Sequence, residues 1–167
     1  SHMFGATLHH TGLAASDWTE LEKWRIDLTA QLGAEGRQPY SIPIGGSTAV
    51  GALGYVDAYD EIMQQCNDHH FVPSAILHTS SSGGTHAGLV AGSVLARVAN
   101  LPRAPVIAIG VAKGAALSTR GIRILAEESL ALLGSTAAVL DIDVIIDDRF
   151  LGDDYAAPTR ARAAAAK

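Results

Sequence analysis

Short apolar runs alternate with longer amphipathic stretches along most of the chain, and this alternation constrains the fold more than any other feature. Runs of this kind are typical of strands, whereas the stretches between them have helical spacing. Strands are expected at residues 6–10, 40–44, 75–79, 106–111 and 144–147. Helices are expected from 17 to 33 or 36, and at 50–66, 85–99 and 117–133. This order predicts an α/β fold, a mostly parallel sheet with helices on its faces.

Individual residues refine the expected elements. Asp17 and Glu20 have the spacing of a capping box at the start of the first helix. The prolines around residues 40–44 favour an edge strand. The almost wholly apolar run at 106–111 is typical of a strand buried on both faces.

Composition excludes several classes of partner. The chain has 167 residues, is 48% hydrophobic and 17% charged, and carries a net charge of -5. That charge argues against nucleic-acid or anionic-membrane binding. A single cysteine, Cys66, permits no intramolecular disulfide, and with no secretory or membrane-length apolar run we expect a cytoplasmic protein. The histidines lack metal-ligand spacing, so no metal site is expected.

The most informative segment is residues 76–88, where an expected strand leads through serines and glycines into a helix. Glycines allow close backbone approach, and amides at a helix N-terminus favour an anion. The hydroxyls of Ser81, Ser82 and Thr85 would add donors. The segment therefore predicts phosphate or carboxylate binding, with a plain capped turn as the alternative. It is not a Walker A loop, because no Gly-Lys-Ser/Thr follows.

Two motifs carry a family resemblance. Residues 39–58 read P-Y-S-I-P-I-G-G-S-T-A-V-G-A-L-G-Y-V-D-A and resemble P-Y-V-I-P-V-G-G-S-N-x-x-G-A-L-G-Y-V-E-A. Residues 82–88 read S-G-G-T-H-A-G and resemble an S-x-G-T-H-A-G loop. Both patterns are those of the D-cysteine desulfhydrase and 1-aminocyclopropane-1-carboxylate deaminase family, which depends on pyridoxal 5'-phosphate (PLP). From residue 4 or so to 158, the chain resembles an internal portion of this family.

The resemblance implies part of a fold type II PLP enzyme, similar to the tryptophan synthase β-subunit. Residues 1–3 are interpreted as a cloning remnant and start, and 4–37 as a possible remnant of the small domain. Residues 38–158 would form the core of the large PLP-binding domain, followed by a tail at 159–167. The tail could begin a further helix.

The resemblance also implies site residues. Ser81, Ser82, Gly83, Gly84 and Thr85 would hold the cofactor phosphate. Tyr155 lies in a Y-A-A-P segment that resembles a family Y-G-x-P segment, whose tyrosine faces the active site. It is the candidate for polarising the substrate or transferring a proton, with an exposed loop tyrosine as the alternative, because Ala156 replaces the family glycine.

The implied function is that of a PLP-dependent lyase or deaminase of small amino acids, releasing sulfide from D-cysteine or opening aminocyclopropane-carboxylate. The expected partners are a small amino-acid substrate and a second copy of the chain. The family's Schiff-base lysine lies in an upstream G-N-K-x-R-K-like stretch, and none of Lys23, Lys113 and Lys167 matches it. We therefore expect a truncated portion that carries the phosphate-binding loop, residues 81–85, which is called the cradle below. A catalytically inactive anion- or cofactor-binding domain, or a truncated remnant, is the alternative.

Overall fold

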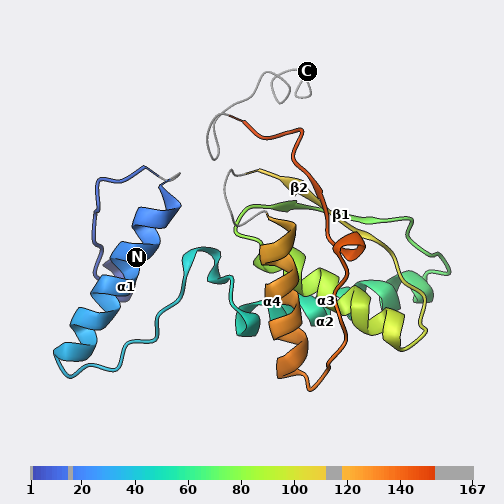
Figure 1. Cartoon of the computed structure of the whole chain (residues 1–167), viewed down its shortest axis with the longest axis horizontal. Coiled ribbons are helices and arrows are strands. Elements are labelled where there is room, and N and C mark those ends of the chain that lie inside the picture. The colour runs from blue at the N-terminus through green and yellow to red at the C-terminus, as the bar shows by residue number, and fades with distance from the viewer. Residues whose placement is uncertain (1, 15–16, 112–117, 153–167) are drawn as a thin grey trace. The chain divides into compact units, whose positions relative to one another are not determined.

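The chain divides into two compact units, Ser1–Pro43 and Ile44–Lys167. A computed structural model describes residues 2–14, 17–111 and 118–152 of it, as traced in Figure 1. In these described ranges no helix combines the length and the hydrophobicity needed to cross a bilayer. The predicted helix within 159–167 lies outside the described residues.

The smaller unit is built around one helix. A short 3-10 turn, η1 (His2–Phe4), precedes the helix α1 (Trp18–Ala34). Asp17 is the N-cap residue as predicted, but its carboxylate accepts a hydrogen bond from the Ala14 amide at 3.0 Å. The predicted capping box is therefore wrong, since this carboxylate makes no bond to the first turn of the helix.

Two predicted strands are absent. Residues 6–10 have no regular structure, and residues 40–44 form an irregular segment that enters the 3-10 turn η2 (Ile44–Gly46). A strand is stable only when its backbone donors and acceptors are paired with a neighbouring strand. Neither segment has such a neighbour among the described residues, and local apolar pattern alone could not reveal this.

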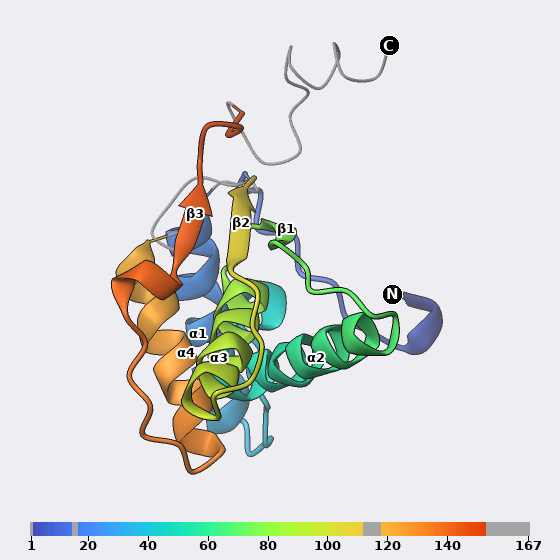
Figure 2. The same cartoon turned by 90° about the vertical axis from the view of Figure 1, so that its right-hand side faces the viewer.

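The larger unit contains the remaining predicted helices and strands at nearly the expected positions. They are α2 (Ala49–Asp68), β1 (Ile76–Ser80), α3 (Gly84–Val98), β2 (Val106–Gly110), α4 (Thr119–Leu132), the 3-10 turn η4 (Asp141–Asp143) and β3 (Ile145–Asp147). The three strands form a parallel sheet in the order β1-β2-β3. Figure 2 shows the strands side by side above the helices of this unit. The predicted α/β class with a parallel sheet is confirmed.

The sheet is buried more deeply on one face than on the other. Val106, Ala108 and Gly110 are buried along β2, and between them Ile107 and Ile109 are only partly buried. On β1, Leu77 pairs with Ile107 and remains 64% exposed. The prediction that residues 106–111 form a strand buried on both faces is therefore wrong for the described part of the chain.

Close packing of α3 on α2 forms the centre of the core. A Cβ atom at Gly88 would lie 2.3 Å from the Ala52 carbonyl oxygen, and one at Gly92 would lie 2.5 Å from the Tyr59 Cβ. Only glycine permits this helix separation. Tyr59 is 1% exposed, and its hydroxyl both donates to the Ala104 carbonyl and accepts from the Ala104 amide, at 3.0 Å each. These contacts position α2 and α3 side by side.

Candidate functional site: an anion cradle at two helix N-termini

The predicted Ser/Gly segment lies where β1 ends and α3 begins. β1 ends at Ser80, Ser81 and Ser82 form the loop, and α3 begins at Gly84. Gly83 is the N-cap residue and has a φ of 91°, a left-handed conformation that favours glycine. The structure thus brings Ser81 to Thr85 together at the carboxyl end of a parallel strand, the edge at which open α/β sheets bind ligands.

A second loop contacts the first. Gly45 and Gly46 both have positive φ angles, 70° and 63°, and turn the chain into Ser47. The Ser47 hydroxyl donates to the Ser82 Oγ at 2.8 Å and accepts from the Gly84 amide at 3.1 Å. From the sequence, this Gly-Gly-Ser segment was recognised only as part of the family-like motif at residues 39–58. Its position just before a helix was the signal that could have added Ser47 to the site.

The two helices bring their N-termini to the same end. Contacts advance in parallel along α2 and α3: Gly84 lies against Ser47, Gly88 against Ala52, and Gly92 against Tyr59. Each helix N-terminus carries a partial positive charge from the aligned peptide dipoles. Two such ends beside one loop favour a negatively charged ligand more than either end alone.

Several donors of the loop are free to meet a ligand. The backbone bond from the Ala87 amide to the Gly83 carbonyl, 2.9 Å long, opens the hydrogen-bond ladder of α3. The amides of Thr85 and His86 precede it and have no acceptor within the helix. The hydroxyls of Ser81 and Thr85, both partly buried, make no hydrogen bond within the described ranges. This donor set matches the oxygen atoms of a phosphate group.

Two histidines contact each other on the elements that flank the cradle: His86 of α3 is buried, and His78 of β1 is partly buried. The Nδ1 of His78 bonds to the Thr79 carbonyl at 2.9 Å, so its proton is on Nδ1 and its Nε2 accepts from the Nδ1 of His86 at 3.1 Å. Burial, reinforced by His78, lowers the pKa of His86 to about 3, and burial also lowers the pKa of His78. Both rings are therefore neutral near pH 7. The Nε2 of His86 and the Ser80 Oγ are buried and have no partner in the described part of the chain.

The remaining residues considered from the sequence are Tyr155 and the three lysines. Tyr155, the catalytic candidate, lies outside the described residues, as do Lys113 and Lys167. Lys23 lies on α1 in the smaller unit, in a helix with no buried residue. The structure therefore does not test the predicted catalytic role of Tyr155, nor the exclusion of the three lysines as the Schiff-base residue.

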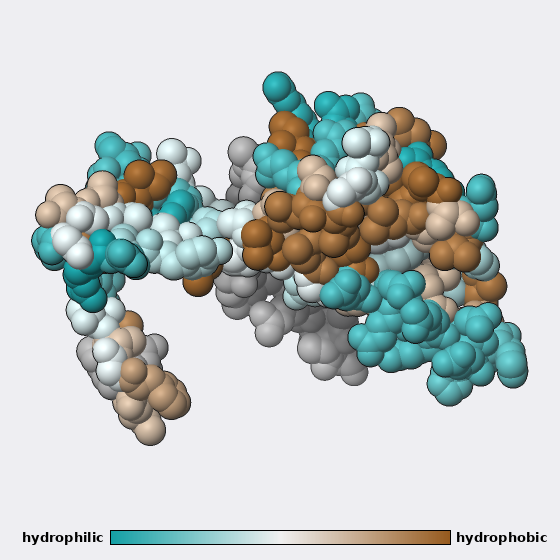
Figure 3. Space-filling model, turned by 90° about the horizontal axis from the view of Figure 1, so that it is seen from below, coloured by the Kyte–Doolittle hydropathy of each residue, from teal (hydrophilic) through white to brown (hydrophobic). Residues whose placement is uncertain are grey.

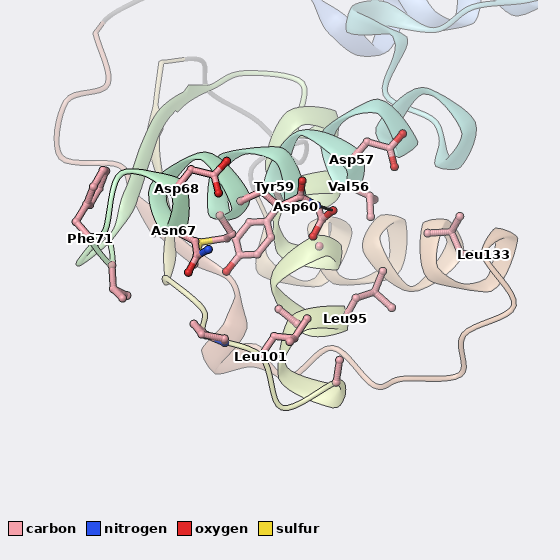
Figure 4. A pocket seen from close by; sticks show the side chains of 17 residues that line it. Val56, Asp57, Tyr59, Asp60, Asn67, Asp68, Phe71, Leu95, Leu101 and Leu133 are labelled. Carbon is pink, nitrogen blue, oxygen red and sulfur yellow. Dashed lines mark hydrogen bonds between the residues drawn. The ribbon is translucent and has the colours of Figure 1, made fainter.

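A cavity of about 640 Å³ lies toward the other end of α2 and α3. Figure 4 shows its lining, in which Tyr59, Leu95 and Phe71 supply apolar surface and Asp57 and Asp60 project from α2. From below, Figure 3 shows a broad hydrophobic area on the larger unit next to a hydrophilic one. Among the described residues, none of Ser81 to Thr85 lines this cavity, so it is separate from the cradle.

Comparison with known proteins identifies the relatives of the chain. It is 35% identical over 141 residues to D-cysteine desulfhydrase of Klebsiella pneumoniae subsp. pneumoniae, and 34% identical over 140 residues to that of Salmonella typhi. Each match covers 84% of this chain but 40% of the relative. No protein-family model matches. The resemblance carried by the two motifs is thereby confirmed: the chain is homologous to a portion of the D-cysteine desulfhydrases and spans about two fifths of their length.

Proposed function

We propose that this chain is the phosphate-binding portion of a PLP-dependent lyase or deaminase that acts on a small amino acid. The observation that carries the proposal is the cradle formed by Ser81 to Thr85 at the junction of β1 and α3, within a chain homologous to D-cysteine desulfhydrases. PLP, when bound, supplies an electron sink for breaking bonds at the α-carbon of an amino acid.

The residues of the loop fit the phosphate of such a cofactor. Gly83 and Gly84 have no side chains, so a ligand can closely approach the unpaired backbone amides of Thr85 and His86 at the start of α3. The Ser82 and Thr85 hydroxyls add donors, and the N-termini of α2 and α3 add favourable dipoles. In this arrangement the chain binds the anionic end of the cofactor and fixes its orientation, whereas chemistry at the amino acid requires further groups.

Phosphate binding is the first test of the proposal. Titration of the chain with PLP and with inorganic phosphate, followed by calorimetry and ³¹P NMR, should show binding of both at one site. We expect Ser82→Ala and Thr85→Ala each to weaken binding at least about tenfold, because a hydrogen bond to a charged group contributes about 1.5–3 kcal/mol and about 1.4 kcal/mol corresponds to a factor of ten. Gly54→Ala is a matched control, since no atom lies within 4 Å of a Cβ at this helical position. Equal affinity in all variants would contradict the proposed cradle.

A second candidate function is a cofactor- or anion-binding domain without turnover. It is favoured by the lack of a family-like motif around any of the three lysines of the given sequence. Borohydride reduction of the PLP-loaded chain, followed by peptide mass mapping, tests for covalent attachment to a lysine. A single labelled lysine together with sulfide release from D-cysteine supports the enzyme. Tight PLP binding with neither result supports the binding domain.

A further inference from the structure

Ser47 connects the loop before α2 with the cradle loop between β1 and α3, although it is 35 positions from Ser82 in the chain. Its Oγ accepts from the Gly84 amide at 3.1 Å and donates to the Ser82 Oγ at 2.8 Å. Ser47 therefore completes the N-terminal cap of α3 from a different segment, since the N-cap residue itself, Gly83, has no side chain.

These bonds determine which way the hydroxyl protons point. A serine hydroxyl can donate one hydrogen bond, and the Ser47 hydroxyl donates it to the Ser82 Oγ. The Ser82 proton is then directed away from Ser47, and the described residues offer it no acceptor. A hydroxyl that accepts one hydrogen bond also becomes a stronger donor of another. The sequence of bonds from Gly84 through Ser47 thus presents Ser82 as an outward donor.

Two glycines preserve the spacing that this arrangement needs. A Cβ at Gly45 would lie 2.1 Å from the Ser82 Oγ, and a Cβ at Gly84 would lie 2.8 Å from the Ser47 Oγ. Real Cβ atoms do not approach other atoms so closely, so a side chain at either position would displace one of the two serines. The contact between Ser47 and Ser82 is therefore built into both loops.

We propose that Ser47 is a positioning residue that orients the Ser82 hydroxyl as a hydrogen-bond donor to the phosphate group of the ligand. This inference rests on the proposed function of the cradle. Ser47 acts through Ser82: its own proton and its acceptor site are both used within the protein, so Ser82 makes the contact with the anion.

A double-mutant cycle on the full chain tests this role, with inorganic phosphate and PLP as the two probes and calorimetric affinity as the measurement. We expect Ser47→Ala and Ser82→Ala each to weaken phosphate binding about tenfold. The double variant should bind no more weakly than Ser82→Ala alone, because Ser47 has no effect once its target is removed. Ser135→Ala is the control: it also removes a serine–backbone bond, to the Ala137 amide, and should not alter affinity.

The outcomes separate this inference from the proposed function. Normal binding by Ser47→Ala, with weakened binding by Ser82→Ala, overturns the positioning role and leaves the cradle intact. Tighter binding by Ser47→Ala also overturns it, because Ser47 would then compete with the anion for the Gly84 amide. No binding by the unaltered chain overturns both proposals. Ser47→Cys, which keeps a weak donor and acceptor, should show a smaller loss and serves if Ser47→Ala does not fold.

Discussion

At the scale of single residues, His86 couples the folding of the larger unit to pH. Its side chain is fully buried, and burial lowers its pKa from 6.5 to about 3. The folded chain therefore holds this ring neutral, whereas the unfolded chain binds a proton below about pH 6.5. Between these two pH values the unfolded state binds more protons at this ring than the folded state does. Stability therefore rises with pH through this window, and the contribution of the ring is fully present above it.

We predict that replacing His86 reduces the acid sensitivity of folding. In the unaltered chain, the contribution of this ring should lower the free energy of unfolding by up to about 1.4 kcal/mol for each pH unit below 6.5. His86→Gln, which does not titrate, should show a shallower slope between pH 6.5 and 3, although its stability at pH 7 is lower. His69→Gln, at an exposed position, is the control. Parallel pH profiles for His86→Gln and the unaltered chain would contradict the prediction. Urea unfolding at several pH values provides the measurement.

At the scale of elements, local pattern predicted most of the larger unit. Apolar periodicity located β1, β2, α2, α3 and α4, because each element buries one side against the same core. It failed at residues 6–10, where an apolar run has no neighbouring strand with which to pair. The loop from Ser81 to Thr85 was predictable because its residues are contiguous. The partnership of Ser47 with Ser82 was not, since it depends on how α2 packs against α3.

We predict opposite effects of the same substitution at two helical glycines. Gly88→Ala places a Cβ 2.3 Å from the Ala52 carbonyl and should destabilise the chain by about 1–3 kcal/mol, because the helix backbones must separate. Gly54→Ala meets no atom within 4 Å and should stabilise it by about 0.5–1 kcal/mol, since alanine restricts the unfolded chain. Chemical denaturation measures both. A stabilising Gly88→Ala would show that α2 and α3 are not in close contact.

At the scale of the larger unit as a whole, Asp143 connects segments that are far apart in the chain. Its side chain is 4% exposed and pairs with Arg97 of α3 at 3.3 Å and with Arg103, before β2, at 3.5 Å. It also accepts a hydrogen bond from the Leu140 amide at 2.9 Å. One carboxylate thus joins α3, the approach to β2 and the turn η4 that leads into β3.

We predict that Asp143→Asn destabilises the larger unit although it keeps the shape of the side chain. The substitution removes the charge that two arginines share, and we expect a loss of about 1–3 kcal/mol, moderated because both arginines are partly exposed to solvent. Asp141→Asn is the matched control in the same turn: Asp141 is 74% exposed and pairs only with Arg123 in the described part, so we expect a loss of at most about 0.5 kcal/mol. Urea unfolding of both variants at pH 7 measures the difference. Equal losses would contradict the prediction. They would mean that the buried Asp143 stabilises the larger unit no more than an exposed ion pair does.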